Sequence, residues 1–186
     1  ELSKIFDLFK TKLNEGKLEF QYCCMISKIS IPSSITSIKN YSFSYCESLT
    51  QITIPTSVTS IENYSFSYCE SLTQITIPTS VTSIENYAFE QCNKLKEIIL
   101  PSTINKIGEK AFYRCSSLAK ITIPPFLTKI ENGVFYECSS LKQITIPSSV
   151  KTIGEEAFYR CSSLENISIE SSSLSVISGY AFYECS

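Results

Sequence analysis

The chain has 186 residues, enough for one domain with a continuous apolar core. Its 16 basic and 18 acidic residues give a formal net charge of -2, which argues against a nucleic-acid or anionic-membrane partner because both need a basic face. The sequence contains no His, so the commonest general base and a common zinc or copper ligand are both missing. It also contains no apolar run long enough to span a membrane and no visible secretory signal.

Residues 1–19 lie before the repeats and predict a separate element. Their apolar residues recur at helical spacing, at Leu2, Ile5, Leu8, Phe9 and Leu13, and Gly16 stands where a helix would end. We expect an amphipathic helix that caps the first repeat. The alternative is a targeting or membrane-surface helix, which is weakened by the acidic residues that offset the lysines.

A repeat of 23 residues dominates the remainder, residues 20–186. Residues 41–63 and 64–86 are the same string, YSFSYCESLTQITIPTSVTSIEN. One cysteine per repeat keeps the register until an extra residue enters between Glu170 and Ser173; the column is Cys23, Cys46, Cys69, Cys92, Cys115, Cys138, Cys161 and Cys185.

Each repeat predicts a short strand, an extended connector and a helical turn. In the repeat from Leu49, Ile52 and Ile54 alternate inward along a strand, and Pro55 ends it because proline donates no hydrogen bond. Val58 and Ile61 then point inward from an extended connector. The spacing of Ile61, Ser65, Phe66 and Cys69 favours one or two helical turns with a buried face, and 108–115 and 154–161 contain better helix formers.

A single repeat buries too few apolar side chains to offset the conformational entropy of ordering its backbone, so the repeats must stack. Strands about 4.8 Å apart would then form a parallel sheet on one side of the stack. Bulkier helical or 3-10 turns on the other side would make that sheet concave.

The pattern LxxIxIPxxVxxIxxxAFxxCxxL is similar to the BspA-like class of leucine-rich repeats, over residues 20–186. The resemblance implies an α/β leucine-rich-repeat solenoid, or horseshoe, with a concave parallel sheet of about seven short strands. It also implies adhesion to, or binding of, a partner protein, since this class is associated with surface proteins of anaerobic bacteria and parasitic protists.

The cysteine column has two interpretations. Regular cysteines can form disulfides, or bind a metal when they occur as close pairs. These are single, one per repeat, and each follows the inward Phe, so we interpret them as buried unpaired thiols and expect no metal site and no cofactor.

The solvent-facing residues of the predicted strands form the candidate binding face. The outward side chains line up across repeats and span on the order of 30 Å, enough for a protein interface. Against this, Thr and Gln suit any exposed strand, and duplication alone aligns like residues. The candidate partner-binding residues are Lys28, Gln51, Thr53, Gln74, Thr76, Lys96, Glu97, Ile99, Lys120, Thr122, Gln143, Thr145 and Asn166.

Three further irregularities stand out. Ile99 interrupts a column of hydroxyl residues and is a candidate anchor for a partner. Phe126 replaces Ser or Thr after Pro124–Pro125 and is expected on the rim of that face, either contacting a partner or covering the next repeat. On the opposite side, a column of alternating charge, Arg114, Glu137, Arg160 and Glu184, beside a row of tyrosines is expected to form ion pairs between repeats.

No nucleophile–base pair, phosphate-binding glycine loop or converging carboxylate pair occurs, so we expect no catalytic residue and no small-molecule substrate. The leading hypothesis is a protein-binding or adhesion module that is cell-surface or secreted. The alternative is a cytoplasmic scaffold that regulates a signalling enzyme such as a protein phosphatase or small GTPase. Because the chain begins at Glu1 without Met and stops within a repeat, we interpret it as a fragment whose uncapped last repeat associates end to end or frays.

Overall fold

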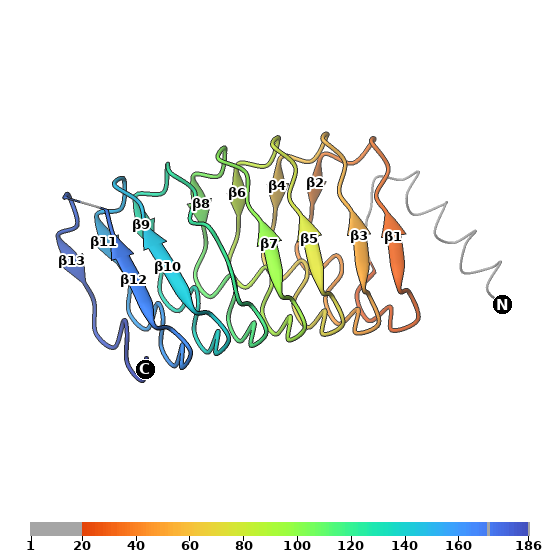
Figure 1. Ribbon diagram of the computed structural model, residues 1–186. Coiled ribbons are helices and arrows are strands. Elements are labelled where there is room, and N and C mark those ends of the chain that lie inside the picture. The colour runs from red at the N-terminus through yellow and green to blue at the C-terminus, as the bar shows by residue number, and fades with distance from the viewer. Residues whose placement is uncertain (1–19, 171, 186) are drawn as a thin grey trace.

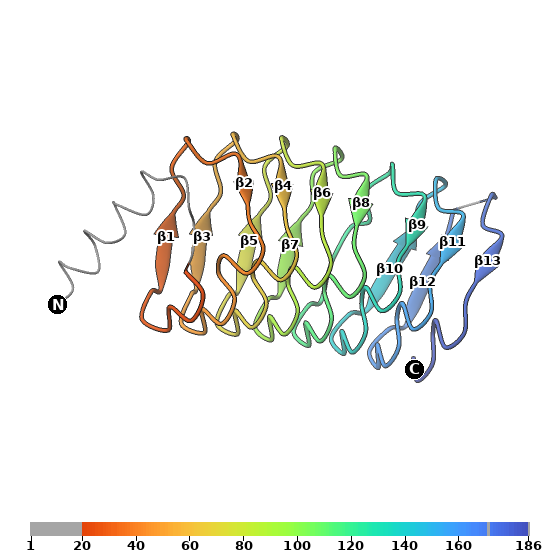
Figure 2. The same ribbon diagram turned by 180° about the vertical axis from the view of Figure 1, so that it is seen from behind.

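A computed structural model describes residues 20–170 and 172–185, which form a continuous stack of similar coils. The coils lie side by side in one row, as Figures 1 and 2 show from opposite sides. We number them from the first residue of each repeat's first strand or its equivalent: coils 1 to 7 begin at Lys28, Gln51, Gln74, Glu97, Lys120, Gln143 and Asn166. The chain is thus a parallel β-solenoid with a period of about 23 residues. The predicted helix over residues 1–19 lies outside the described residues.

In six of the seven coils the first strand lies where the repeat pattern predicts it. These strands are β1 (Lys28–Ser30), β3 (Gln51–Thr53), β5 (Gln74–Thr76), β7 (Glu97–Ile99), β10 (Gln143–Ile146) and β12 (Asn166–Ile169). Coil 5 contributes only an isolated parallel bridge between Lys120 and Glu97. The row is therefore not one sheet of about seven strands: the paired strands are β1–β3, β5–β7 and β10–β12. We call the surface formed by these residues the first-strand face.

A second row of strands occupies the segment predicted to be an extended connector. It comprises β2 (Ser37–Ile38), β4 (Ser60–Ile61), β6 (Ser83–Ile84), β8 (Lys106–Ile107), β9 (Lys129–Ile130), β11 (Thr152–Ile153) and β13 (Val176–Ile177). These pair in parallel as β2-β4-β6-β8 and β9-β11-β13. They form a second-strand face behind the first in Figure 1.

The predicted helical turns are wrong, because the described residues contain no helix. In their place each coil makes a compact turn, and we call this row of turns the turn side. Amides of alternate residues bond in different directions: Phe66 donates to Ala88 O of the next coil at 2.8 Å, whereas Ser67 donates to Tyr64 O at 3.2 Å. The backbone can alternate in this way because Tyr64 (φ 55°) and Tyr68 (φ 59°) adopt the left-handed conformation. The inter-coil bonds replace those of a helix.

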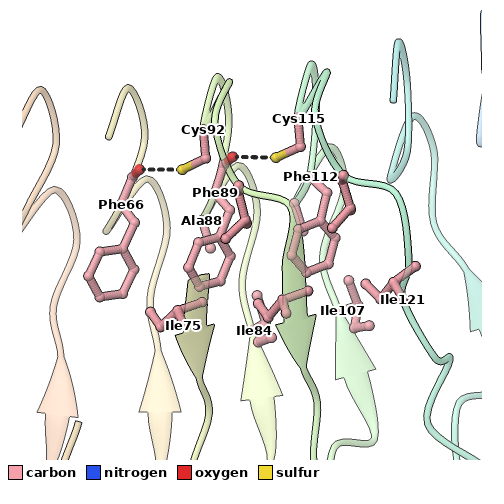
Figure 3. Close-up of a cluster of buried hydrophobic side chains, with 14 of the residues drawn as sticks. Phe66, Ile75, Ile84, Ala88, Phe89, Cys92, Ile107, Phe112, Cys115 and Ile121 are labelled. Carbon is pink, nitrogen blue, oxygen red and sulfur yellow. Dashed lines mark hydrogen bonds between the residues drawn. The ribbon is translucent and has the colours of Figure 1, made fainter. Parts of the chain in front are cut away.

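The core is shared by all coils, as stacking requires. The inward strand residues Ile52 and Ile75 are buried, and so are Val58 and Ile61 from the connector. Phenylalanines from successive turns stack with ring centroids 5.2 Å apart for Phe43–Phe66 and for Phe66–Phe89. Figure 3 shows the phenylalanine rings beside the inward isoleucines. The predicted assignment of inward and outward positions is therefore confirmed.

The last coil differs from the others in exposure. Ile167, Ile169, Val176 and Ile177 occupy core-type positions but are 40%, 46%, 47% and 53% exposed. End-to-end association or fraying of that coil stays a prediction.

Candidate protein-binding face

The candidate residues on the first-strand face are all exposed, and strand pairing aligns them in columns. Gln74 lies opposite Glu97, and Thr76 lies opposite Ile99. The remaining members are also exposed: Lys28, Gln51, Thr53, Lys96, Lys120, Thr122, Gln143, Thr145 and Asn166. Each first strand before β12 fixes its outward side chains by burying the isoleucine between them, which is why the period-2 pattern located them from sequence.

Two apolar side chains stand out from this polar surface. Ile99, at the end of β7, is 58% exposed. Phe126, in the loop after the coil 5 bridge, is 66% exposed, and the neighbouring Pro125 is exposed as well. Phe126 therefore lies at the surface, as predicted. Large apolar groups held outside a packed core are the groups that most often anchor a protein partner.

The face also has shallow hollows where first strands of adjacent coils are unpaired. One of about 310 Å³ is lined by residues of coils 2 and 3, including Gln51, Thr53, Gln74 and Thr76. Another of about 210 Å³ is lined by residues of coils 5 to 7, including Lys120 and Gln143. Nine of the predicted residues line these two hollows, and their role in binding a partner stays a prediction.

A third hollow includes a residue that the sequence analysis missed. It measures about 410 Å³ and is lined by Lys96, Lys142, Ala119 and three serines. Lys142 precedes β10 as Lys96 precedes β7, so comparing the column immediately before each strand would have identified it. The two lysines give this edge of the first-strand face a local positive charge.

The turn side offers a competing surface with a hollow of about 450 Å³, whose charged lining residues Arg114, Glu137, Arg160 and Glu184 pair with one another. Arg114 pairs with Glu137 at 2.8 Å, Arg160 with Glu137 at 3.5 Å, and Arg160 with Glu184 at 2.7 Å. The predicted ion pairs between coils are thus confirmed. Tyr113 stacks on Tyr136 at 4.7 Å between ring centroids, so ring faces are turned toward each other and not toward a partner.

The buried row of thiols predicted for the cysteine column is confirmed for six of its eight members, whereas Cys23 and Cys185 are half-buried. Six are buried and none of the described cysteines is in a disulfide; the buried ones are Cys46, Cys69, Cys92, Cys115, Cys138 and Cys161. Burial raises the pKa of the Cys46 thiol to about 12 and that of Cys69 well above its usual range. Among the described residues no cluster of His, Cys, Asp or Glu could hold a metal ion. Nor does any helix there have the length and apolarity to cross a membrane.

Comparison with known proteins agrees with this architecture. The chain is similar to a leucine-rich repeat protein from Bacteroides ovatus (35% identity, TM-score 0.80, 84% of this chain and 41% of that one). It is also similar to a leucine-rich repeat protein of T. pallidum (26% identity, TM-score 0.79, 86% of this chain and 78% of that one). The chain thus spans less than half the length of the Bacteroides ovatus protein. None of the curated protein sequences matches it.

The family itself is established by the repeats. The model described as the BspA type leucine rich repeat region matches six copies, over residues 16–128 and 83–186. Those ranges include every described coil and the inward Ile, Val, Phe and Cys positions that build the core. The chain therefore belongs to the BspA-type leucine-rich-repeat family.

Proposed function

We propose that this chain is a binding module for another protein and that the partner lies across the first-strand face, the face expected to be concave. The observation that carries the proposal is Ile99, 58% exposed in a column of hydroxyl side chains. Burying such a side chain in a partner would contribute about 1.5–3 kcal/mol, enough to make it an anchor. Phe126 would provide a second anchor on the adjacent coil, and the proposal assigns no catalytic role to any residue.

The surrounding polar residues support specificity. Lys96, Lys120 and Lys142 are exposed on this side of coils 3 to 5, and Glu97 lies among them. Mixed charge around apolar anchors is the usual composition of a protein interface, in which the rim stays polar and orients the partner. A protein partner with an apolar protrusion and acidic residues around it would fit this surface.

The test compares three substitutions. Ile99→Glu and Lys120→Glu each place a negative charge on the first-strand face, and Asn105→Glu places one at an exposed position beside the second-strand face. Proteins retained by the immobilised chain are quantified by mass spectrometry for all three variants. A partner lost with Ile99→Glu and Lys120→Glu but kept with Asn105→Glu supports the proposal, and a partner kept by all three variants contradicts it.

The proposed location is the cell surface or the surrounding medium, which rests on the family resemblance. The second candidate, a cytoplasmic scaffold for a signalling enzyme, is favoured by one observation: the six buried cysteines form no disulfide, and reduced thiols are typical of proteins inside cells. Biotinylation of intact cells separates the two. Labelling of the chain by a reagent that does not cross the membrane supports the surface location, and labelling only after lysis supports the scaffold.

A further inference from the structure

The boundary between coils 4 and 5 differs from the other boundaries on the second-strand face. Asn105 N donates to Thr82 O at 3.0 Å, and Lys151 N donates to Thr128 O at 2.8 Å. Between Thr128 and Asn105 themselves the described structure has no corresponding bond, and β8 does not pair with β9. This is the one place in the described coils where the second row of strands is interrupted.

The first-strand face adds little strand pairing at this boundary to make up for the missing pairing of β8 with β9. Here the two coils are joined by the single bridge between Glu97 and Lys120. The first-strand row is also interrupted between β3 and β5, but there β4 and β6 still pair on the opposite face. Each other boundary from coil 1 to coil 7 keeps its second-strand pairing, so this one has the weakest connection between strands.

Two side-chain contacts that recur at other boundaries are also lost. The hydroxyl of Ser80 donates to Val58 O at 2.6 Å, and that of Thr103 to Val81 O at 2.9 Å. Phe126 occupies the equivalent position in coil 5 and has no hydroxyl to donate to coil 4.

The second lost contact involves an asparagine. Asn86 Oδ1 accepts the backbone amide of Glu109 at 2.9 Å, and Asn132 Oδ1 accepts that of Glu155 at 3.0 Å. Glu109 stands at the intervening position, where the described structure shows only a contact of 3.4 Å from Asn132 Nδ2 to its carboxylate. The substitutions that weaken the boundary are therefore visible in the sequence.

Packing is looser at the same boundary. The Phe112–Phe135 ring centroids are 5.7 Å apart, against 5.5 Å for Phe89–Phe112 and 5.2 Å for Phe66–Phe89 and for Phe135–Phe158. A small apolar void of about 10 Å³ lies beside Ile107 and Val134. Val134 stands where other coils have Ala or Ser, so its larger side chain offers a physical reason for the wider spacing.

The turn side, in contrast, stays fully connected. Lys110, Phe112 and Arg114 donate their amides to Asn132 O, Val134 O and Tyr136 O of coil 5 at 3.0, 3.0 and 2.7 Å. The Arg114–Glu137 ion pair crosses the same boundary. Coils 4 and 5 are thus joined by hydrogen bonds and an ion pair on the turn side and by few contacts on the two strand faces. The turn side therefore defines an axis about which the two coils can open.

We propose that the boundary between coils 4 and 5 is a hinge, at which residues 20–119 and 120–185 rotate against each other about the turn side. Local opening in proteins follows the weakest connections, and elsewhere in this stack each boundary is held by strand pairing as well. The hinge lies between Ile99 and Phe126, so rotation changes the spacing of two exposed apolar groups.

Two label pairs with equal separation test the hinge. Nitroxides are attached to cysteines introduced at Thr82 and Lys151, which span the boundary, or at Thr36 and Asn105, which are also three coils apart but lie on one side of it. All four positions are exposed, and Cys23, Cys24 and Cys185 are replaced by Ser so that only buried thiols remain. Distances are measured by double electron–electron resonance.

The expected result is a distance distribution about twice as wide for the Thr82/Lys151 pair as for the Thr36/Asn105 pair. Glu109→Asn with Phe126→Ser restores the side chains found at the other boundaries and should narrow the first distribution to the width of the second. Equal widths in the natural chain, or a width that the restored contacts do not change, would overturn the proposal.

Discussion

The thiol of Cys92 donates a hydrogen bond to Phe66 O across a coil boundary, with Sγ and the oxygen 3.2 Å apart (Figure 3). The same contact recurs from Cys115 to Phe89 O at 3.1 Å. Each of the six buried cysteines therefore fills the core as a small apolar group and also connects its coil to the one before. A thiol can serve this purpose only while it is protonated.

Thiol reactivity should divide the cysteines by their position in the coils. Cys24 is exposed, Cys23 and Cys185 are half-buried, and the other six are buried. Because the thiolate is the nucleophile, burial protects a cysteine both by excluding reagent and by raising its pKa. We expect iodoacetamide to modify Cys24 first and the six buried thiols only after unfolding, as measured by mass spectrometry of the intact chain. Rapid labelling of Cys92 in the folded chain would contradict the buried row.

Stability should fall as the pH rises above the ordinary thiol pKa. Burial raises the pKa of Cys46 from 9.0 to about 12, so the unfolded chain releases this proton at a lower pH than the folded chain does. The stabilising effect is complete below pH 9 and is lost progressively between pH 9 and pH 12, by about 1 kcal/mol for this thiol at pH 10. Urea unfolding at pH 7 and pH 10 measures the change. Cys46→Ala should reduce the difference between the two pH values, whereas Cys24→Ala should leave it as it is in the natural chain.

Replacing a glycine by alanine should destabilise the chain only where the backbone of the neighbouring coil lies close to that glycine. A Cβ at Gly108 would lie 2.5 Å from Asn86 N and even closer to Asn86 Oδ1, whereas a Cβ at Gly179 meets nothing within 4 Å. Gly108→Ala should lower the free energy of unfolding by about 1–3 kcal/mol because the backbones must move apart. Gly179→Ala is the matched control and should change it little. Equal effects of the two variants in urea unfolding would refute the close approach at Gly108.

The sequence predicted the inward and outward positions well because they depend on a period that every coil repeats. Ile52, Val58 and Phe66 are buried, and Gln51 and Thr53 are exposed, as the alternation required. The second row of strands was missed because each strand is as short as Ser60–Ile61 and its pairing comes from the neighbouring coil. Likewise, the sequence near Lys120 does not predict that the strand of this coil is reduced to an isolated bridge.

The helical turns were wrongly predicted because local spacing cannot reveal competition from a neighbouring coil. The segment around Glu156 contains good helix formers, yet Glu156 has a φ of 55° and donates its amide to Gly179 O of the next coil at 3.1 Å. A left-handed residue costs about 1–2 kcal/mol, and the amide bonds to the next coil offset that cost.

This cost predicts a stabilising substitution. In Glu156→Gly the left-handed conformation carries no Cβ penalty, which removes the cost of about 1–2 kcal/mol from the folded state. The greater conformational freedom of glycine in the unfolded chain offsets about 0.5–1 kcal/mol of this stabilisation. We expect a net increase of about 0.5 kcal/mol in the free energy of unfolding, measured with urea. The neighbouring Glu155, which is outside the left-handed positions, is the control: Glu155→Gly should lower stability. Destabilisation by both variants would mean that the turn tolerates Glu156 at no cost, and the explanation given for the missing helix would then lose its energetic basis.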